Sequence, residues 1–408
     1  MKRVFLIVLD SVGIGEMPDA KDYGDEGSNT LLSCTRSSRY FLPNMERLGI
    51  GAIDGVRDWY PERKGEQKEG GSGEVLKPAG YSGAVGRLAE ASKGKDTTTG
   101  HWEIAGLVSK TPMPLFPEGF PRELLDEFER RTGRGTLCNR PYSGTDAIRD
   151  FGEEHMKTGA LIVYTSADSV FQVAAHESVV PIQELYEICE TARELCTGKF
   201  AVGRVIARPF EGEAGSFRRT ERRHDFSLVP PKDTMLDELL AHGKEVLAVG
   251  KINDIFAGKG IGEFMRTSGN ADGIDKTIAY MKRKFEGLCF TNLVDYDMLY
   301  GHRNDVDGYA EALTYFDSRL PELLALLGEE DILMITADHG CDPATPSTDH
   351  SREYVPLVMA GGPIKAGTNI GTKETFADIG ATILDYFGLK GKISGESFLK
   401  EICVSHIL

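Results

Sequence analysis

Short apolar runs alternate along the chain with longer amphipathic stretches. The runs that predict strands are VFLIVL (4–9), EVLAVG (245–250), LCFTNLV (288–294), DILMITA (331–337) and VPLVMA (355–360). The stretches that predict helices are 233–241, 271–286, 307–327 and 374–387. Continuous apolar strands separated by helices are typical of parallel sheets that are buried on both faces. The pattern therefore predicts an α/β core with a mainly parallel sheet covered by helices on both faces.

The predicted helix 307–327 has the clearest amphipathic pattern. Apolar residues recur in it at helical spacing, and they are Ala310, Leu313, Phe316 and Leu320. This spacing places them on one face of the helix, which we expect to be buried.

Ionisable residues follow most of the predicted strands. They are Asp10, Lys251, Asp295, Asp297, Asp338 and His339. In open α/β sheets, ligands bind outside the carboxyl ends of the strands. We therefore expect these residues to converge on one cleft, although they are spread over most of the chain.

The middle of the chain has a different character. Proline-rich segments stand at its two ends, TPMPLFPEGFP at the entrance and LVPPKD at the exit, and such junctions often mark domain boundaries. We predict an inserted α/β cap domain over 109–231 and a core made of 1–108 and 232–408. The elements expected in the cap are helices near 122–131, 145–157 and 183–196 and strands at 160–166 and 200–210. The polar, glycine-rich segment 62–74 is predicted to be a mobile loop.

Composition narrows the class of protein. The 408 residues, 40% hydrophobic and 27% charged, are typical of a folded globular chain of about two domains. The net charge of -16 argues against partners such as nucleic acid or an anionic membrane, and no obligatory protein partner is evident. Seven cysteines without CxxC spacing indicate a reducing compartment. The first apolar run is too short for a secretion signal, so we expect a cytoplasmic protein.

Six acids and imidazoles form a candidate metal site. They are Asp10, Asp297, His302, Asp338, His339 and His350. Two divalent cations need about this many oxygen and nitrogen ligands, three per ion. Taken singly, an aspartate after a strand is more often a helix cap or turn former, and a lone histidine is usually structural. The joint pattern favours metal, because a cluster of carboxylates without a counter-ion would repel itself.

The stretch GKDTTTGHWE (94–103) offers hydroxyl groups beside this cluster. A hydroxyl becomes a competent nucleophile when a cation stabilises its alkoxide form, so one threonine could attack phosphorus. The alternative is a helix cap, in which Asp96 or a threonine caps a helix that begins near His101. The residues themselves support both interpretations.

Five blocks together resemble the phosphopentomutase family of the alkaline phosphatase superfamily. They are LDSVGIGE (9–16), GKDTTTGHWE (94–103), YTSADSV (164–170), NLVDYDMLYGHR (292–303) and ADHGCDPATPSTDH (337–350). The resemblance implies an alkaline-phosphatase-like core with a mobile cap and two divalent cations, usually manganese. It also implies the interconversion of ribose 1-phosphate and ribose 5-phosphate, or of the deoxyribose equivalents, through a phosphothreonine enzyme and a pentose bisphosphate. A sugar bisphosphate is the expected activator.

The resemblance also assigns residues. It implies that Asp10, Asp338 and His339 hold one ion, that Asp297, His302 and His350 hold the other, and that Thr97 is the phosphorylated nucleophile. The residues that it implies for binding the pentose phosphate are Ser166, Asp168, Arg204 and Lys251. His101, Trp102 and Glu103 are expected to support the nucleophile loop. One position departs from the family pattern, because this chain has Cys341 where that pattern has asparagine, and this puts the metal preference in doubt.

Two other functions are compatible with these motifs. One is another two-metal phosphoryl-transfer enzyme of the superfamily, a phosphoglycerate mutase or a phosphatase. The mutase is expected to use serine where this chain has Thr97, and a phosphatase would hydrolyse pentose phosphate without isomerising it. The other is a metal-binding protein that recruits a partner and transfers nothing.

Overall fold

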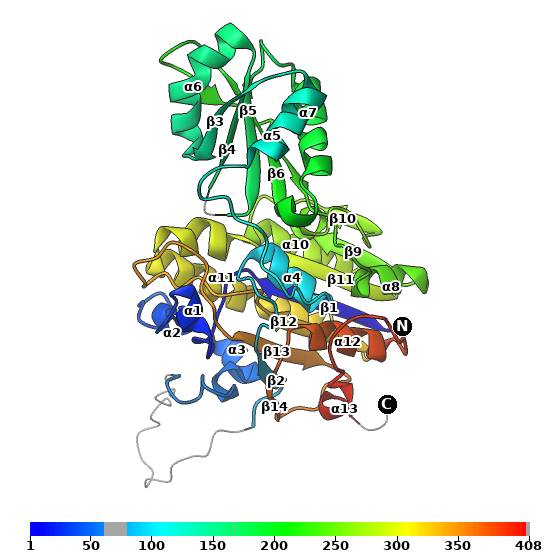
Figure 1. The fold of residues 1–408 in the computed structure, drawn as a ribbon. Coiled ribbons are helices and arrows are strands. Elements are labelled where there is room, and N and C mark those ends of the chain that lie inside the picture. The colour runs from blue at the N-terminus through cyan, green and yellow to red at the C-terminus, as the bar shows by residue number, and fades with distance from the viewer. Residues whose placement is uncertain (61–79, 167, 405–408) are drawn as a thin grey trace. The chain divides into compact units, whose positions relative to one another are not determined.

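The computed structural model describes residues 1–60, 80–166 and 168–404 (Figure 1). The predicted mobile loop at 62–74 lies outside the described residues. The chain forms two compact units. Unit 1 comprises Met1–Thr111, Pro230–Asn253 and Gly258–Leu408, and unit 2 comprises Pro112–Val229 and Asp254–Ala257. Among the described residues, no helix has both the length and the apolar character that crossing a bilayer requires.

Unit 1 is built on a sheet of eight strands in the order β10-β9-β11-β1-β12-β13-β2-β14 (Figure 1). The strands are β1 (Arg3–Leu9), β2 (Ala84–Leu88), β9 (Glu245–Val249), β10 (Glu263–Met265), β11 (Gly287–Leu293), β12 (Asp331–Thr336), β13 (Val355–Gly361) and β14 (Thr368–Lys373). All five predicted strands form, as β1, β9, β11, β12 and β13. β1 runs parallel to both of its neighbours, β11 and β12. The predicted, mainly parallel α/β sheet is confirmed.

β13 differs from the other predicted strands in its direction. It runs antiparallel to β12 and to β2. An apolar run shows that a strand is buried, but it carries no information about which way the strand runs. The apolar pattern did not predict β2, β10 or β14, because their short runs contain glycine or polar residues. Gly86 in β2 is required there, since a side chain would overlap Ile370 of β14.

Helices cover both faces of this sheet. The longer ones are α4 (Thr97–Ile104), α8 (Met235–Ala241), α10 (Asn270–Met281), α11 (Val306–Ala325) and α12 (Ala377–Tyr386). The shorter ones are α1 (Ala20–Tyr23), α2 (Thr30–Cys34), α3 (Pro43–Leu48), α9 (Ile252–Ile255) and α13 (Leu399–Ile402). Thr291 of β11 bonds Thr277 of α10, whereas the adjacent Phe290 packs on His101 of α4. Because successive strand side chains point to opposite faces, α10 and α4 lie on opposite faces.

The four apolar positions expected on the buried face of 307–327 are all buried in α11. This helix packs against α10, α2 and α3. It begins after Asp305, whose side chain accepts a hydrogen bond from Gly308 N and so caps the first turn. The amphipathic pattern therefore predicted both the helix and its orientation.

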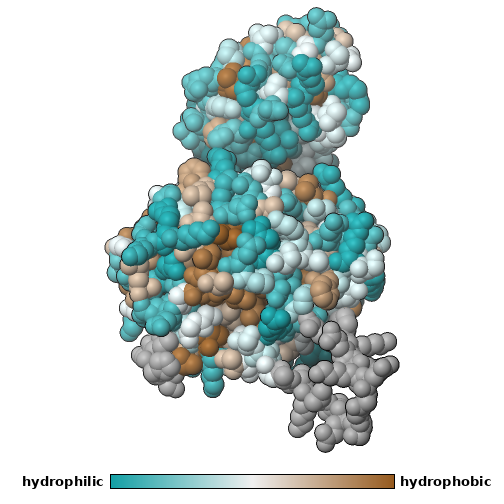
Figure 2. All heavy atoms as spheres, turned by 180° about the vertical axis from the view of Figure 1, so that it is seen from behind, coloured by the Kyte–Doolittle hydropathy of each residue, from teal (hydrophilic) through white to brown (hydrophobic). Residues whose placement is uncertain are grey.

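Unit 2 contains a mixed sheet of six strands. The strand order is β3-β4-β5-β6-β7, and β8 pairs with β6. The strands are β3 (Thr136–Pro141), β4 (Leu161–Thr165), β5 (Val170–His176), β6 (Arg204–Glu211), β7 (Arg218–Arg219) and β8 (His224–Ser227). The helices are α5 (Arg122–Thr132), α6 (Gly144–Thr158) and α7 (Ile182–Leu195). One apolar cluster joins α5 and α7 to the sheet, and a smaller one lies under α6. Hydrophilic side chains cover most of the face of unit 2 seen in Figure 2, and the apolar clusters of this unit are buried.

Candidate active site

Two neighbouring strands of unit 1 position the first group of candidate metal ligands. β1 ends at Leu9 and β12 ends at Thr336, so that Asp10 and the Asp338–His339 pair lie just beyond the strand ends. All three side chains are fully buried. His339 Nε2 lies 3.3 Å from Asp10 Oδ1 and 3.4 Å from Asp338 Oδ2. These are distances at which three donors can surround a single ion.

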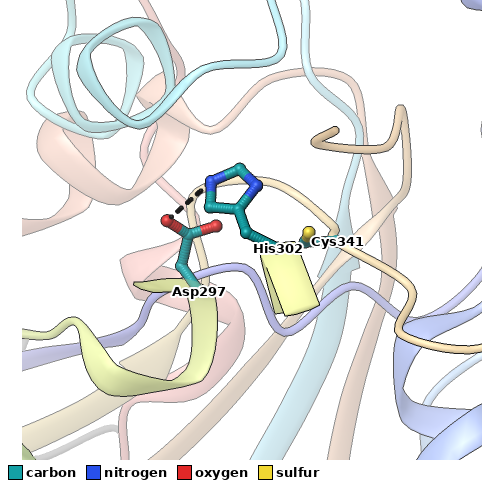
Figure 3. A group of neighbouring side chains, drawn as sticks. All are labelled: Asp297, His302 and Cys341. Carbon is teal, nitrogen blue, oxygen red and sulfur yellow. Dashed lines mark ion pairs between the residues drawn. The ribbon is translucent and has the colours of Figure 1, made fainter. Parts of the chain in front are cut away.

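The second group comes from the segment after β11 and from the loop before β13. Asp297 lies on a π-helical turn, Tyr296–Tyr300, and His302 lies on the short 3₁₀ turn that follows. A π-helical turn widens the helix locally and often marks a functional site. Asp297 Oδ1 lies 3.2 Å from His350 Nε2, and its Oδ2 lies 3.3 Å from His302 Nε2 (Figure 3). The rings of His339 and His350, 4.1 Å apart, join the two groups.

Several polar atoms in these groups are buried without a hydrogen-bond partner among the described residues. They are Asp10 Oδ1, Asp297 Oδ1, Asp338 Oδ2 and His350 Nε2. Such atoms are rare in folded proteins, because an unsatisfied buried acceptor costs free energy. Carboxylate oxygens and imidazole nitrogens are the ligands that divalent cations prefer. The donor set therefore fits divalent metal ions.

The electrostatics of this cluster also indicate a site for a cation. Burial raises the pKa of Asp297, but the His350 imidazole and its neighbours outweigh burial and hold that pKa well below its usual range. Burial likewise raises the pKa of Asp338, and His339 does most to lower it to about 2. Burial lowers the pKa of His339, but the surrounding acids raise it well above its usual value. In the cation-free protein, protons on His302 and His339 offset the charge of the acids, and a metal ion would take over that role on binding.

The stretch of three threonines begins helix α4. Asp96 is its N-cap and accepts hydrogen bonds from the Thr99 backbone N–H at 3.1 Å and from the Thr99 hydroxyl at 2.6 Å. Thr97 is buried, and its Oγ1 lies 3.2 Å from His339 Nε2. The helix begins at Thr97, four residues before the expected start near His101. The helix-cap interpretation is confirmed by Asp96 and Thr99. Thr97 faces the candidate metal ligands, and its role as the nucleophile stays a prediction.

His101 ties this helix to the ligands. Its Nδ1 donates to the Thr97 carbonyl oxygen at 2.8 Å and lies 3.0 Å from Asp338 Oδ2. Asn292 donates to Asp10 Oδ2 at 2.8 Å and to His101 Nε2 at 3.3 Å. The sequence motif predicted that His101 supports the threonine loop, but it did not predict a role for Asn292. The available signal was the position of Asn292 near the end of β11. Ligand orientation by such neighbours commonly sets metal affinity.

Close packing also fixes α4. A Cβ atom at Gly100 would overlap the backbone carbonyl oxygen of Asp338, so only glycine lets the helix approach the ligand segment this closely. Glu103 is buried and accepts hydrogen bonds from the backbone N–H groups of Ala91 and Ser92, in the segment before the threonines. Glu103 therefore fixes the segment that precedes the threonine stretch.

A buried ion pair that the sequence analysis overlooked supports the same loop. Arg352, two residues after His350, has a side chain only 1% exposed and donates to Glu90 Oε2 at 2.6 Å. The same guanidinium donates to the Gly94 carbonyl oxygen at 2.7 Å. Arg352 thus joins a ligand-bearing segment to the start of the threonine stretch. Its sequence context, TDHSRE, gave no sign of burial.

The predicted substrate-binding residues are divided between the units. In unit 2, Ser166 Oγ accepts a hydrogen bond from Asp168 N at 3.3 Å, and Arg204 lies 3.4 Å from Asp168 Oδ2. Arg204 lies equally far from Asp225, so that this arginine is held between two acids. Lys251 belongs to unit 1, where it follows β9, is half-buried and has no ion-pair partner among the described residues.

Comparisons with known proteins add independent evidence. A model of the metalloenzyme superfamily matches residues 2–391. Phosphopentomutase from Lachnoclostridium phytofermentans is 63% identical over 401 residues, which cover 98% of this chain and 99% of that protein. Phosphopentomutase from Carboxydothermus hydrogenoformans is 57% identical over 403 residues, which cover 98% of this chain and 100% of that protein.

The fold also matches a solved structure. A protein from Pyrococcus horikoshii aligns with a TM-score of 0.50 at 15% identity, over 97% of this chain and 99% of that chain, so the two chains share a fold. The family resemblance of the sequence motifs is confirmed by the full-length identities. The chain therefore belongs to the phosphopentomutase family, within the metalloenzyme superfamily.

Proposed function

We propose that this enzyme interconverts ribose 1-phosphate and ribose 5-phosphate, and the deoxyribose equivalents, by way of a phosphorylated Thr97. One observation carries the proposal. The Thr97 hydroxyl stands at the start of a helix, 3.2 Å from His339 Nε2, beside buried carboxylate oxygens that lack hydrogen-bond partners among the described residues. A hydroxyl in this position is placed to exchange a phosphoryl group. The identities to phosphopentomutases favour this function over a phosphoglycerate mutase or a phosphatase.

We propose two divalent cations, with manganese as the resident metal. Asp10, Asp338 and His339 would hold one ion, and the second would be held by Asp297, His302 and His350. When bound, such a pair of ions stabilises negative charge on the attacking and departing oxygens of phosphoryl transfer.

The residues of the chain itself define the rest of the cycle. Phospho-Thr97 gives its phosphoryl group to the free hydroxyl of a pentose monophosphate, so the bond from phosphorus to Thr97 Oγ1 breaks as the bond to the sugar oxygen forms. The resulting bisphosphate reorients, and Thr97 recovers the other phosphate. The partial positive charge at the N-terminus of α4 favours the phosphorylated state. His101 holds the Thr97 backbone through both half-reactions.

The remaining proposals concern substrate binding, the cap and the place of the enzyme in the cell. Arg204 and Lys251 would bind the distal phosphate, Asp168 would bind sugar hydroxyls, and Ser166 would also contact the substrate. Residues 109–231 would act as a cap that excludes water and suppresses hydrolysis of phospho-Thr97. We place the enzyme in the cytoplasm, in nucleoside salvage, with a sugar bisphosphate as the activator that first phosphorylates Thr97.

The test compares the native protein with Thr97→Ala and Thr97→Ser in a coupled assay of ribose 1-phosphate conversion with added manganese. Thr97→Ala should bind metal as the native protein does but transfer nothing, whereas Thr97→Ser should retain measurable transfer because the hydroxyl remains. Mass spectrometry of the native protein after treatment with a sugar bisphosphate should find one phosphate, on Thr97. Equal turnover by native protein and Thr97→Ala would remove Thr97 from the mechanism, and release of phosphate without isomerisation would favour a phosphatase.

A further inference from the structure

Helix α6 of unit 2 begins without a capping side chain (Figure 1). The helix has 15 residues, Gly144–Thr158, and the side chain of its N-cap, Ser143, makes no hydrogen bond to the first turn. The acid of that turn, Asp146, is paired with Arg149. The first N–H groups of a helix have no partner inside it and carry partial positive charge, so they attract anions. The side chains around the helix end decide whether an anion is bound there.

A buried hydroxyl faces this helix end. Tyr164, on β4, is 1% exposed, and its Oη is buried without a hydrogen-bond partner in the part of the chain that the structure describes. A Cβ atom at Gly144 would lie only 2.5 Å from this Oη, so the hydroxyl points at the first residue of α6. Buried polar atoms are almost always satisfied, because leaving one unpaired costs free energy. The unpaired hydroxyl therefore indicates a ligand at the helix end.

An arginine without a counter-charge reaches the same place. A Cβ atom at Gly144 would also overlap Arg219 Nη2, so this guanidinium and the Tyr164 hydroxyl meet at one point beside the helix end. Arg219 is exposed and makes no ion pair with any residue that the structure describes, whereas the adjacent Arg218 pairs with Glu211. A guanidinium, a hydroxyl and backbone N–H groups therefore converge there, and all three are donors of hydrogen bonds.

Two further arginines add positive charge around Tyr164. Arg208 donates to Gln172 Oε1 at 2.9 and 3.1 Å, and this amide is neutral. Burial raises the pKa of Tyr164, and three neighbouring guanidiniums act against that rise, those of Arg208, Arg219 and Arg223. The acid beside them, Asp225, pairs with Arg223 at 2.7 Å, so the group keeps a net positive charge. The charge of this group favours an anion.

We propose that the N-terminus of α6, the Tyr164 hydroxyl and Arg219 form a phosphate-binding site of unit 2. A dianionic phosphate group fits these donors, because it accepts hydrogen bonds from backbone N–H groups and from a hydroxyl and pairs with guanidinium in a bidentate manner. The group comes from inorganic phosphate or from a sugar phosphate, which present the same oxygens. This inference goes beyond the proposed function and needs neither metal ions nor Thr97, because its residues all belong to unit 2.

The first measurement is calorimetry of the full-length, metal-free protein with inorganic phosphate as the probe. Arg219→Gln should lower the phosphate affinity about 10-fold, the usual effect of losing one charged hydrogen bond. Arg218→Gln is the matched control, because Arg218 is the adjacent exposed arginine of β7 and pairs with Glu211. This control should keep the native affinity.

Tyr164→Phe separates a ligand contact from a packing role. The variant loses only the hydroxyl, which has no partner among the described residues, so the free energy of unfolding without phosphate should stay the same or rise. Its phosphate affinity should nevertheless fall about 10-fold. Phosphate should therefore raise the thermal unfolding temperature of the native protein more than that of the variant.

Titration with ribose 5-phosphate identifies the source of the phosphate group. If its binding also weakens in Arg219→Gln, the site takes the phosphate of a sugar phosphate; if only binding of inorganic phosphate weakens, the site takes the free anion. The inference is wrong if the native protein binds no phosphate, or if Arg219→Gln or Tyr164→Phe keeps the native phosphate affinity. None of these results bears on Thr97, so the site and the proposed function can fail independently.

Discussion

Replacement of Arg352 by methionine removes a buried cation while keeping most of the side-chain volume. The Arg352 and Glu90 side chains are only 1% and 2% exposed, and their charged atoms lie 2.6 Å apart. Removing one partner of a buried ion pair leaves the other charge uncompensated, which costs about 3–5 kcal/mol. Arg352→Met should therefore lower the free energy of unfolding of unit 1 by about that amount, and it should also reduce activity because the Gly94 carbonyl loses its donor.

The pH dependence follows from Glu90. Burial raises the pKa of Glu90 well above its usual value, and Arg352 acts against that rise. Without Arg352 the pKa rises further. A carboxyl with a raised folded-state pKa contributes stability below its unfolded pKa and loses it as the pH rises through the folded value. The destabilisation by Arg352→Met should therefore be smaller when measured at about pH 5 than at about pH 8, because the lower pH favours the protonated, uncharged Glu90.

The assay is urea unfolding followed by tryptophan fluorescence. Both tryptophans, Trp59 and Trp102, lie in unit 1, so the signal reports the unit that contains the ion pair. The double variant Glu90→Gln/Arg352→Met removes the stranded charge and should recover about 1–2 kcal/mol relative to Arg352→Met. The reasoning is refuted if the two changes are additive and the loss is the same at both pH values.

Other predictions concern the metal centre and the helix beside it. Gly100→Ala should cost about 1–3 kcal/mol and reduce turnover, because the new methyl group overlaps the Asp338 carbonyl oxygen and displaces the helix; thermal unfolding and the coupled assay measure both effects. Asn292→Leu removes the donor to Asp10, so calorimetry should find manganese affinity lowered about 10–100-fold, and native affinity would contradict this. Hydrogen bonds to Asp297 and, second, to Cys341 raise the pKa of His302 to about 11. Manganese binding at neutral pH should therefore release protons and become tighter as the pH rises. Equal binding enthalpies in buffers of different ionisation enthalpy would exclude this proton release.

The comparison of sequence and structure is informative at Thr97. Local chemistry predicts a capped helix from Asp96, and the structure contains that cap. Local chemistry does not say which of the three adjacent threonine hydroxyls faces the cluster of acids and imidazoles. That depends on where the helix starts and on which strand ends the helix approaches. The start lies at Thr97, four residues earlier than expected, and this leaves Thr97 facing His339.

The direction of β13 and the burial of Arg352 also lie beyond local sequence reasoning. An apolar run predicts that β13 is buried, but its direction is set by the connection across the sheet. Arg352 stands in a polar context and is nevertheless buried, because Glu90, far away in the chain, supplies a charge partner. Cys341 is visible in the sequence as a departure from the family pattern, yet its approach to Asp297 and His302 is a matter of three-dimensional packing.

Periodicity and composition determined the elements that local physics controls: five strands, the amphipathic α11 and a parallel sheet covered on both faces. Strand ends in such a sheet meet at one edge, so the sequence could also indicate which acids and imidazoles converge. Tertiary structure alone decided the contacts between segments that are remote in sequence, such as the approach of Gly100 to Asp338 and the bonds of Asn292. The physical reason is that a side chain's partners depend on how the whole sheet and its helices pack, and no local pattern encodes those distances.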